Sequence, residues 1–105
     1  MKRTKSMTYK PSPEATELFL FITNDSFLYH HRTQPIIENL KKKAKKDIYN
    51  SEKAVDLFYY LATAGSNKYF TNYGYKFSVT DRYTVAVDLE SYYKDDEIFY
   101  KLNNN

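Results

Sequence analysis

The stretch of sequence that decides the fold is NSEKAVDLFYYLATAGSNKYFTNYG, residues 50–74. It opens with Asn50-Ser51-Glu52, in which a short polar side chain can cap the first amides of a helix and an acid follows in the first turn. Apolar side chains then recur at helical spacing and cover about 200° of the helix girth, up to the stop signal at Gly74. A helix with so wide an apolar surface contacts neighbours on several sides. We therefore expect an all-α fold, a small bundle of four to five helices around this central third helix.

Two helical segments are predicted before this stretch. Ser12-Pro13-Glu14 supplies a cap, a proline at the first helical position and an early acid, so we expect a helix from Pro13 to Asn24. Pro35 cannot donate an amide hydrogen bond, and its ring clashes with the carbonyl four residues earlier. It therefore predicts a short helix over residues 26–33 and a second piece that begins with Pro35. On that piece Ile36, Ile37, Leu40 and Ala44 share an arc of about 100°, and lysines cover the other side.

A fourth helix is predicted after Ser78, which has the spacing of a capping box with Asp81 in place of the usual glutamate. At 100° per residue, its apolar face consists of Val79, Tyr83, Ala86, Leu89 and Tyr93. Together these segments predict one helical domain over residues 12–102. A flexible basic arm over residues 1–11 precedes it, and a frayed tail over residues 103–105 follows it.

The composition excludes several classes of protein. The 105 residues include no cysteine, so disulfides and thiolate metal sites are excluded. The longest apolar run, Leu18–Ile22, is far short of the roughly 20 residues that span a bilayer, and no signal-peptide core follows the basic N-terminus. Gly65 and Gly74 are the only glycines, which excludes a glycine-rich phosphate loop. We expect a cytoplasmic protein with no membrane association and no cofactor.

The sequence contains no recognisable catalytic or metal-binding set. His30 and His31 are adjacent, so on a helix they point about 100° apart, whereas a metal pair needs facing side chains one turn apart. The acidic run Asp95-Asp96-Glu97 is typical of a solvated helix end. We therefore predict no enzyme activity, no catalytic residues and no metal site.

A cluster of lysines is the strongest electrostatic feature. It comprises Lys41, Lys42, Lys43, Lys45 and Lys46, and the basic arm adds Lys2, Arg3, Lys5 and Lys10. These cations can contact phosphates and bind nucleic acid in a salt-sensitive, sequence-independent way. The alternative is an ordinary hydrated helix face, since the net charge is only +3 and lysine lacks the guanidinium fork that recognises guanine edges.

Arg82 and a surplus of tyrosines are the remaining candidates. Arg82 projects at the angle of Ala86 and Leu89, so we expect an inward arginine held by an internal ion pair or a helix-capping bond, with Glu17, Asp56 and Glu52 as possible partners. The alternative is an arginine that binds an anionic ligand. Interface candidates among the tyrosines are Tyr59, Tyr60, Tyr92 and Tyr100. An AT-rich genome would explain the same surplus without any function.

A longer pattern runs from about Thr16 to Glu97 and consists of helix starts and core positions. It includes Tyr29, Gln34-Pro35-Ile36-Ile37, Asn39-Leu40, Lys43, Tyr49, Glu52-Lys53-Ala54-Val55, Leu57-Phe58, Tyr69, Phe77-Ser78, Arg82, Ala86 and Leu89. In these positions the chain resembles a family of short, uncharacterised proteins of tailed bacteriophages, for which no activity is known. It departs from that pattern in its long basic arm and in Asp47-Ile48, which stands where the resemblance implies a glycine before Tyr49. The resemblance implies a phage accessory protein that works in the host cytoplasm.

These observations favour a small non-enzymatic binding protein, encoded by a phage and acting on a host protein as a monomer or small homo-oligomer. The alternative is a nucleic-acid accessory protein that uses Lys41–Lys46 and the N-terminal arm on phosphates. A structural component of the virion is a third interpretation.

Overall fold

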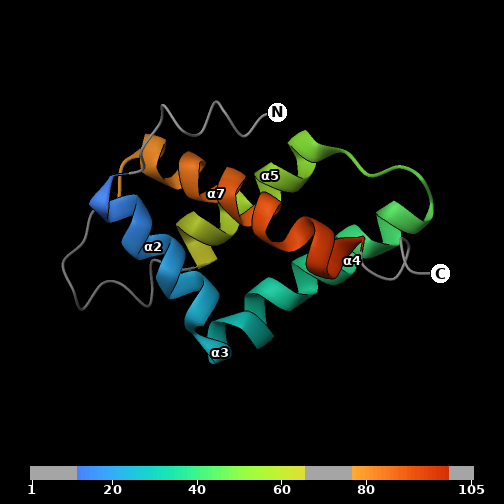
Figure 1. Cartoon of the computed structure of the whole chain (residues 1–105), viewed down its shortest axis with the longest axis horizontal. Coiled ribbons are helices and arrows are strands. Elements are labelled where there is room, and N and C mark those ends of the chain that lie inside the picture. The colour runs from blue at the N-terminus through green and yellow to red at the C-terminus, as the bar shows by residue number, and fades with distance from the viewer. Residues whose placement is uncertain (1–11, 66–76, 100–105) are drawn as a thin grey trace.

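The computed structural model describes residues 12–65 and 77–99, and over these ranges the chain is helical without a strand (Figure 1). The elements are α2 (Pro13–Asn24), α3 (Ser26–Leu28), η1 (Tyr29–Thr33), α4 (Gln34–Lys45), α5 (Ser51–Tyr60), η2 (Leu61–Gly65), α7 (Val79–Tyr93) and η4 (Lys94–Ile98). Those named η are single π-helical turns. The prediction of a small all-α protein built as a helical bundle is confirmed for the described residues.

Helix α2 begins and ends at the predicted residues. The Ser12 hydroxyl accepts a hydrogen bond from the amide of Ala15 at 3.0 Å, and Pro13 follows at the first helical position. The same hydroxyl donates to Asp81 Oδ1 at 2.7 Å. The cap of the first helix is thereby tied to the first turn of α7, 69 residues later in the chain.

The break predicted before Pro35 is replaced by a π turn. Helix α3 passes through η1 into α4 with helical backbone angles, and the amide of Gln34 bonds to the carbonyl of Tyr29, five residues earlier. The wider turn displaces the carbonyls that the Pro35 ring would otherwise contact, so the helix continues where an α-helix would break. Residues 26–45 consequently form one uninterrupted helical segment.

The third predicted helix starts as expected. Asn50 Oδ1 accepts the amide hydrogen of Lys53 at 2.9 Å, and α5 continues into η2. The second half of the prediction, with Tyr69, Phe70 and the stop at Gly74, lies outside the described residues. Within those, α5 packs against α4 and α7, and α7 packs against α2 as well as α5.

Helix α7 has the predicted start, because the Ser78 hydroxyl accepts the amide hydrogen of Asp81 at 3.0 Å. Ala86, Leu89 and Tyr93 are buried as predicted. Val79 and Tyr83 are not: 70% of Val79 and 55% of Tyr83 are exposed. Val85 is buried in their place, so the buried arc of α7 is rotated away from the predicted one toward α2.

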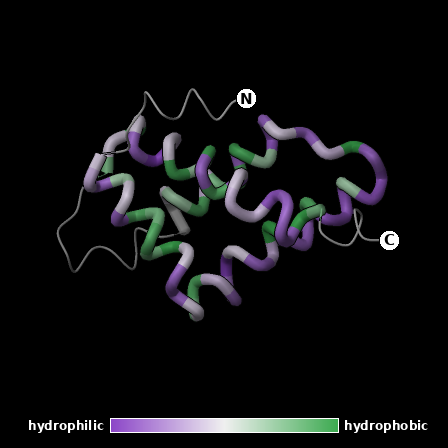
Figure 2. Tube along the Cα trace, in the orientation of Figure 1, coloured by the Kyte–Doolittle hydropathy of each residue, from purple (hydrophilic) through white to green (hydrophobic). Residues whose placement is uncertain are grey.

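The core lies where the apolar faces of the helices meet. Along each helix in Figure 2, hydrophobic and hydrophilic positions alternate in short stretches, as expected for helices with one buried face. The largest fully buried side chains come from every major helix: Leu18, Ile22, Leu28, Ile37, Leu40, Phe58, Leu61, Val85, Leu89 and Ile98. This packing fixes the relative position of α5 and α7, between which the candidate site lies.

Candidate functional site

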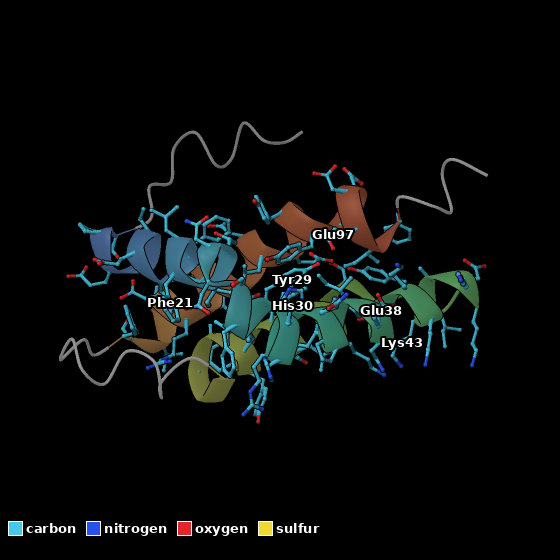
Figure 3. All side chains as sticks on the ribbon, turned by 90° about the horizontal axis from the view of Figure 1, so that it is seen from below. Phe21, Tyr29, His30, Glu38, Lys43 and Glu97 are labelled. Atoms are coloured by element: carbon cyan, nitrogen blue, oxygen red, sulfur yellow. The ribbon has the colours of Figure 1, made fainter. Side chains whose placement is uncertain are left out.

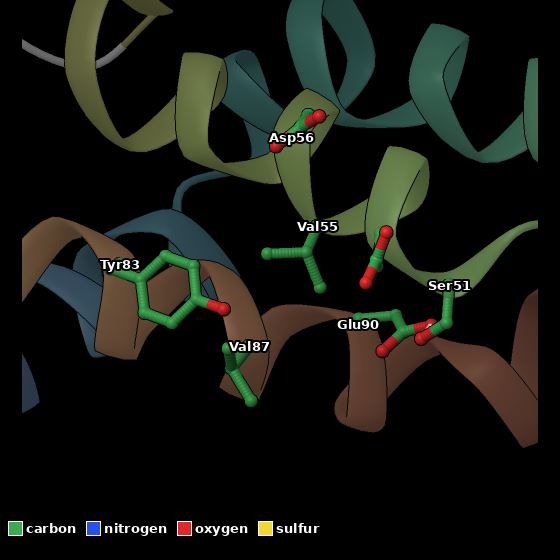
Figure 4. A pocket seen from close by; sticks show the side chains of 7 residues that line it. Ser51, Val55, Asp56, Tyr83, Val87 and Glu90 are labelled. Carbon is green, nitrogen blue, oxygen red and sulfur yellow. Dashed lines mark hydrogen bonds between the residues drawn. The ribbon is translucent and has the colours of Figure 1, made fainter.

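An open cleft with a volume of about 450 Å³ lies between α5 and α7 (Figure 4). Helix α5 contributes Ser51, Glu52, Val55 and Asp56, and helix α7 contributes Tyr83, Val87 and Glu90. We call this site the α5–α7 cleft. Its residues recur at three- and four-residue spacings on each helix, which places each set along one helix face.

One side of the cleft is apolar and exposed. Val79, Tyr83 and Val87 lie one turn apart along α7 and form a stripe about 12 Å long at 1.5 Å per residue. Their exposed fractions are 70%, 55% and 37%. Tyr83 and Val87 line the cleft together with Val55 of α5, which is buried. A row of exposed apolar side chains beside a hollow is unusual for a solvated helix face and is typical of binding surfaces.

The other side of the cleft is acidic. Glu52 and Asp56 are exposed one turn apart on α5. Glu90 lies deeper and is only 7% exposed. Figure 4 shows its carboxylate next to Ser51, at the opposite end of the cleft from Tyr83. The cleft therefore has an apolar end and an acidic end.

The Glu90 carboxylate is held in place by two hydroxyl donors. Ser51 Oγ donates to Glu90 Oε2 at 2.6 Å, and Tyr49 Oη donates to the same oxygen at 2.8 Å. Burial and the neighbouring carboxylate raise the pKa of the Tyr49 phenol above its usual value, so Tyr49 remains a donor at neutral pH. Both donors are neutral, and hydrogen bonding therefore positions the negative charge without neutralising it.

A second tyrosine–carboxylate pair joins η1 to η4. Tyr29 Oη donates to Glu97 Oε1 at 2.7 Å, and Figure 3 shows the two side chains meeting between these segments. Burial is the main cause that raises the pKa of Tyr29 to about 12, and the bond to Glu97 adds to it. Of the acidic run 95–97, Asp95 and Asp96 are exposed. Glu97 thus has a structural contact, while its two neighbours face solvent.

The structure places the predicted lysine cluster on the last turns of α4 and at its C-cap, and none of these lysines lines the α5–α7 cleft. Lys42, Lys45 and Lys46 are exposed, and Lys43 is half-buried (Figure 3). Lys41 Nζ lies 3.7 Å from Glu38 Oε2. The same uninterrupted helical segment carries exposed His30, His31 and Arg32 at its other end. One helical segment therefore carries exposed lysines at one end and two exposed histidines and an arginine towards the other.

The described tyrosine candidates, Tyr59, Tyr60 and Tyr92, are not among the residues that line the cleft. Tyr60 and Tyr92 are exposed, Tyr59 is half-buried against the core, and Tyr100 lies outside the described residues. The Tyr92 ring meets the Phe19 ring edge-on with centroids 5.4 Å apart. The tyrosine that lines the cleft is Tyr83, which the sequence pattern assigned to the core.

Arg82 is half-buried and bonds to main-chain carbonyls. Its Nε donates to the Phe77 carbonyl at 3.2 Å and its Nη1 to the carbonyl of Ala62 in η2. The guanidinium also lies 5.5 Å from the centroid of the Phe77 ring. Arg82 is not among the residues that line the cleft, and the ion pair, helix-capping bond or anion-binding role expected for it stays a prediction.

Neither histidine is part of a metal cluster in the described residues, where no group of three or more possible ligands occurs. His31 Nδ1 lies 3.0 Å from the Phe27 carbonyl, and its ring stacks on Phe27. Within the same ranges, no helix is long and apolar enough to cross a bilayer.

Comparison with known proteins gives no relative: no family model, curated protein or solved structure matches the chain. The site is therefore interpreted from its own chemistry. Sequence reasoning did not find the α5–α7 cleft, although two signals were present. Glu52 and Asp56 are acids four residues apart beside the apolar face of their helix, and Tyr83 and Val87 have the same spacing.

Proposed function

We propose that this protein is a small non-enzymatic binding protein and that the α5–α7 cleft holds its protein partner. The observation that carries the proposal is the exposed stripe of Val79, Tyr83 and Val87 beside an open hollow. Exposed aromatic side chains at the edge of a pocket are the typical anchors of protein interfaces. The resemblance to tailed-phage proteins supports a host protein as the partner and the host cytoplasm as the place of action.

The test is affinity capture from a bacterial lysate with the unmodified protein and two variants. Tyr83→Ser removes the aromatic anchor of the cleft. Tyr92→Ser removes an equally exposed tyrosine nine residues later, which lies 180° around α7 at 100° per residue. We expect the unmodified protein and the Tyr92→Ser variant to capture the same partner. The Tyr83→Ser variant should not capture it. Binding of the purified partner should weaken about tenfold or more with Tyr83→Ser.

Two outcomes would contradict the proposal. One is a captured partner whose purified form binds Tyr83→Ser as tightly as the unmodified protein. The other is a larger effect of Tyr92→Ser than of Tyr83→Ser, which would place the interface on the opposite side of α7.

One specific observation supports the alternative function, a nucleic-acid accessory protein. Lys42, Lys45 and Lys46 are exposed together at the end of α4, where their ammonium groups can reach phosphates. The basic arm that would assist them lies outside the described residues. Retention on a DNA or heparin resin against increasing salt separates this function from the first.

A further inference from the structure

We infer that the α5–α7 cleft takes a lysine side chain of the partner, presented on an amphipathic segment. This inference rests on the proposed function and goes beyond it by naming the chemistry of the occupant. The cleft combines an apolar end, formed by Tyr83, Val87 and Val55, with an acidic end, formed by Glu52 and Glu90 (Figure 4). A lysine side chain complements these two ends: its four methylenes can lie along the apolar end, and its terminal ammonium can then reach the acidic end.

The buried carboxylate excludes an occupant that is apolar throughout. Any partner that closes the cleft removes water from Glu90, and the two hydroxyl donors to Glu90 carry no charge. Lys94 Nζ lies 5.7 Å from the centroid of the Tyr49 ring, but Glu90 has no ion pair within 4 Å among the described residues. Burying an ionised carboxylate without a cation in contact is strongly unfavourable, so an apolar side chain over Glu90 would weaken binding. A cationic side chain supplies the opposite charge, and the exposed carboxylates of Glu52 and Asp56 on the rim attract it.

The geometry at Glu90 favours lysine over arginine. Both hydroxyl bonds converge on Oε2, so this oxygen is already shared between two donors. A guanidinium binds a carboxylate best through two parallel bonds, one to each oxygen. An ammonium is a compact charge with three rotatable donors, and it needs only the remaining oxygen and a neighbouring carboxylate such as Glu52.

The flanking residues of the partner segment follow from the stripe on α7. Val79, Tyr83 and Val87 extend over about 12 Å, which matches two turns of an approaching helix. Apolar side chains one turn before and after the lysine would lie on these residues. The occupant is therefore an amphipathic segment with a lysine set among apolar side chains.

The probe for this inference is a fluorescent amphipathic helical peptide composed of alanine, leucine and lysine. Its affinity for the full chain is measured by fluorescence anisotropy, beside peptides in which every lysine is replaced by arginine or by glutamate. We expect the lysine peptide to bind most tightly and the glutamate peptide least, with binding that weakens as NaCl is raised. Amide chemical shifts of Val55, Val87 and Glu90 should move on binding.

A matched pair of double variants locates the binding charge. Glu52→Gln with Asp56→Asn removes two exposed carboxylates from the cleft, and Asp95→Asn with Asp96→Asn removes two exposed carboxylates from η4. Each exposed ion pair changes affinity by a factor of about 1.4 to 5, so the cleft variant should bind about 2- to 30-fold more weakly. The η4 variant should stay within about twofold of the unmodified chain.

Equal weakening in the two double variants would overturn the inference, because general attraction to an acidic surface would then explain binding. Equal affinity for the lysine and glutamate peptides would overturn it as well. The two proposals fail separately. A protein partner that depends on Tyr83 but not on Glu52 and Asp56 leaves the proposed function standing and removes the lysine. If the lysine peptide binds through these carboxylates but no protein partner depends on Tyr83, the lysine site stands and the proposed function is removed.

Discussion

Replacing Asp47 by glycine is expected to stabilise the protein. Asp47 follows helix α4 with a φ of 60°, in the left-handed region. The amide of Ile48 bonds to the Lys43 carbonyl at 2.9 Å, and the amide of Asp47 bonds to the Ala44 carbonyl at 3.1 Å. These two bonds define a Schellman motif with Asp47 at C′, the position at which glycine is preferred. The resemblance to phage proteins implied a glycine in this part of the sequence.

The size of the stabilisation by Asp47→Gly follows from two favourable contributions and one unfavourable contribution. The left-handed conformation costs a residue with a Cβ about 1–2 kcal/mol of stability. The cost is somewhat smaller for aspartate, which tolerates this conformation better than most residues. Glycine recovers that loss but gives back about 0.5–1 kcal/mol through the greater freedom of the unfolded chain. Removal of the negative charge from the C-terminus of α4 further stabilises the variant by about 0.3–1 kcal/mol, because the helix dipole disfavours an anion there. The net expectation is a gain of about 1 kcal/mol, or about 4–8 °C in Tm.

Thermal and urea unfolding monitored by circular dichroism measure this gain. Asp47→Asn is the matched control, because asparagine also tolerates the left-handed region and removes only the charge. It should give the electrostatic part alone, and that part should vanish at about 1 M NaCl. A Tm of Asp47→Gly below that of the unmodified chain would refute the reasoning. It would mean that the aspartate side chain contributes more than the backbone conformation costs.

Three further predictions concern other parts of the molecule. Arg82→Leu should lower the free energy of unfolding by about 1.5–3 kcal/mol, because the buried Ala62 loses a charged donor to its carbonyl; an unchanged urea midpoint would show that this bond contributes nothing. Stability should fall as the pH rises from 10 towards 12, because Tyr29 has a pKa of about 12 when folded and the usual value of 10 when unfolded; in Tyr29→Phe this decline should be shallower, and an identical pH profile would contradict the assignment. If α4 binds phosphates, changing Lys42, Lys45 and Lys46 to glutamine should reduce the slope of log affinity against log salt by about 0.9 for each lysine that neutralises a phosphate of duplex DNA; no binding to DNA or RNA at about 50 mM salt would end that hypothesis.

Helix starts were predictable because they depend on neighbouring residues alone. Ser12, Asn50 and Ser78 each accept the backbone amide hydrogen three residues later, as short polar side chains at an N-cap do. Each bond forms within four residues, so no tertiary information is needed to foresee it. The same locality explains why both ends of α2 agree with the prediction.

The path of the chain at Pro35 was not predictable in the same way. Proline forbids a regular α-helix there, but a break and a π turn both relieve the clash. The choice depends on whether the helix on each side is held in line by packing. Leu28 and Thr33 before Pro35 and Ile37 and Leu40 after it are all buried, so the core favours one continuous segment.

The rotational phase of α7 was mispredicted because some of its residues are placed against the usual rule. Glu90 is buried although it is charged, while Tyr83 and Val87 are exposed although they are apolar. At 100° per residue the three lie within about 60° of one another around the helix. A periodicity argument assigns apolar side chains to the core and acids to solvent, and it therefore fails for this helix face in particular.

This inversion is itself the strongest reason to place function in the α5–α7 cleft. A sequence shaped by stability alone would put an apolar side chain at position 90 and polar ones at positions 83 and 87. Natural proteins depart from such local rules mainly at functional sites. The hydroxyls of Tyr49 and Ser51 make the buried carboxylate tolerable in the free protein, but they are neutral, and the stripe beside the carboxylate stays in water. A partner that brings a cation flanked by apolar side chains would offset both departures at once.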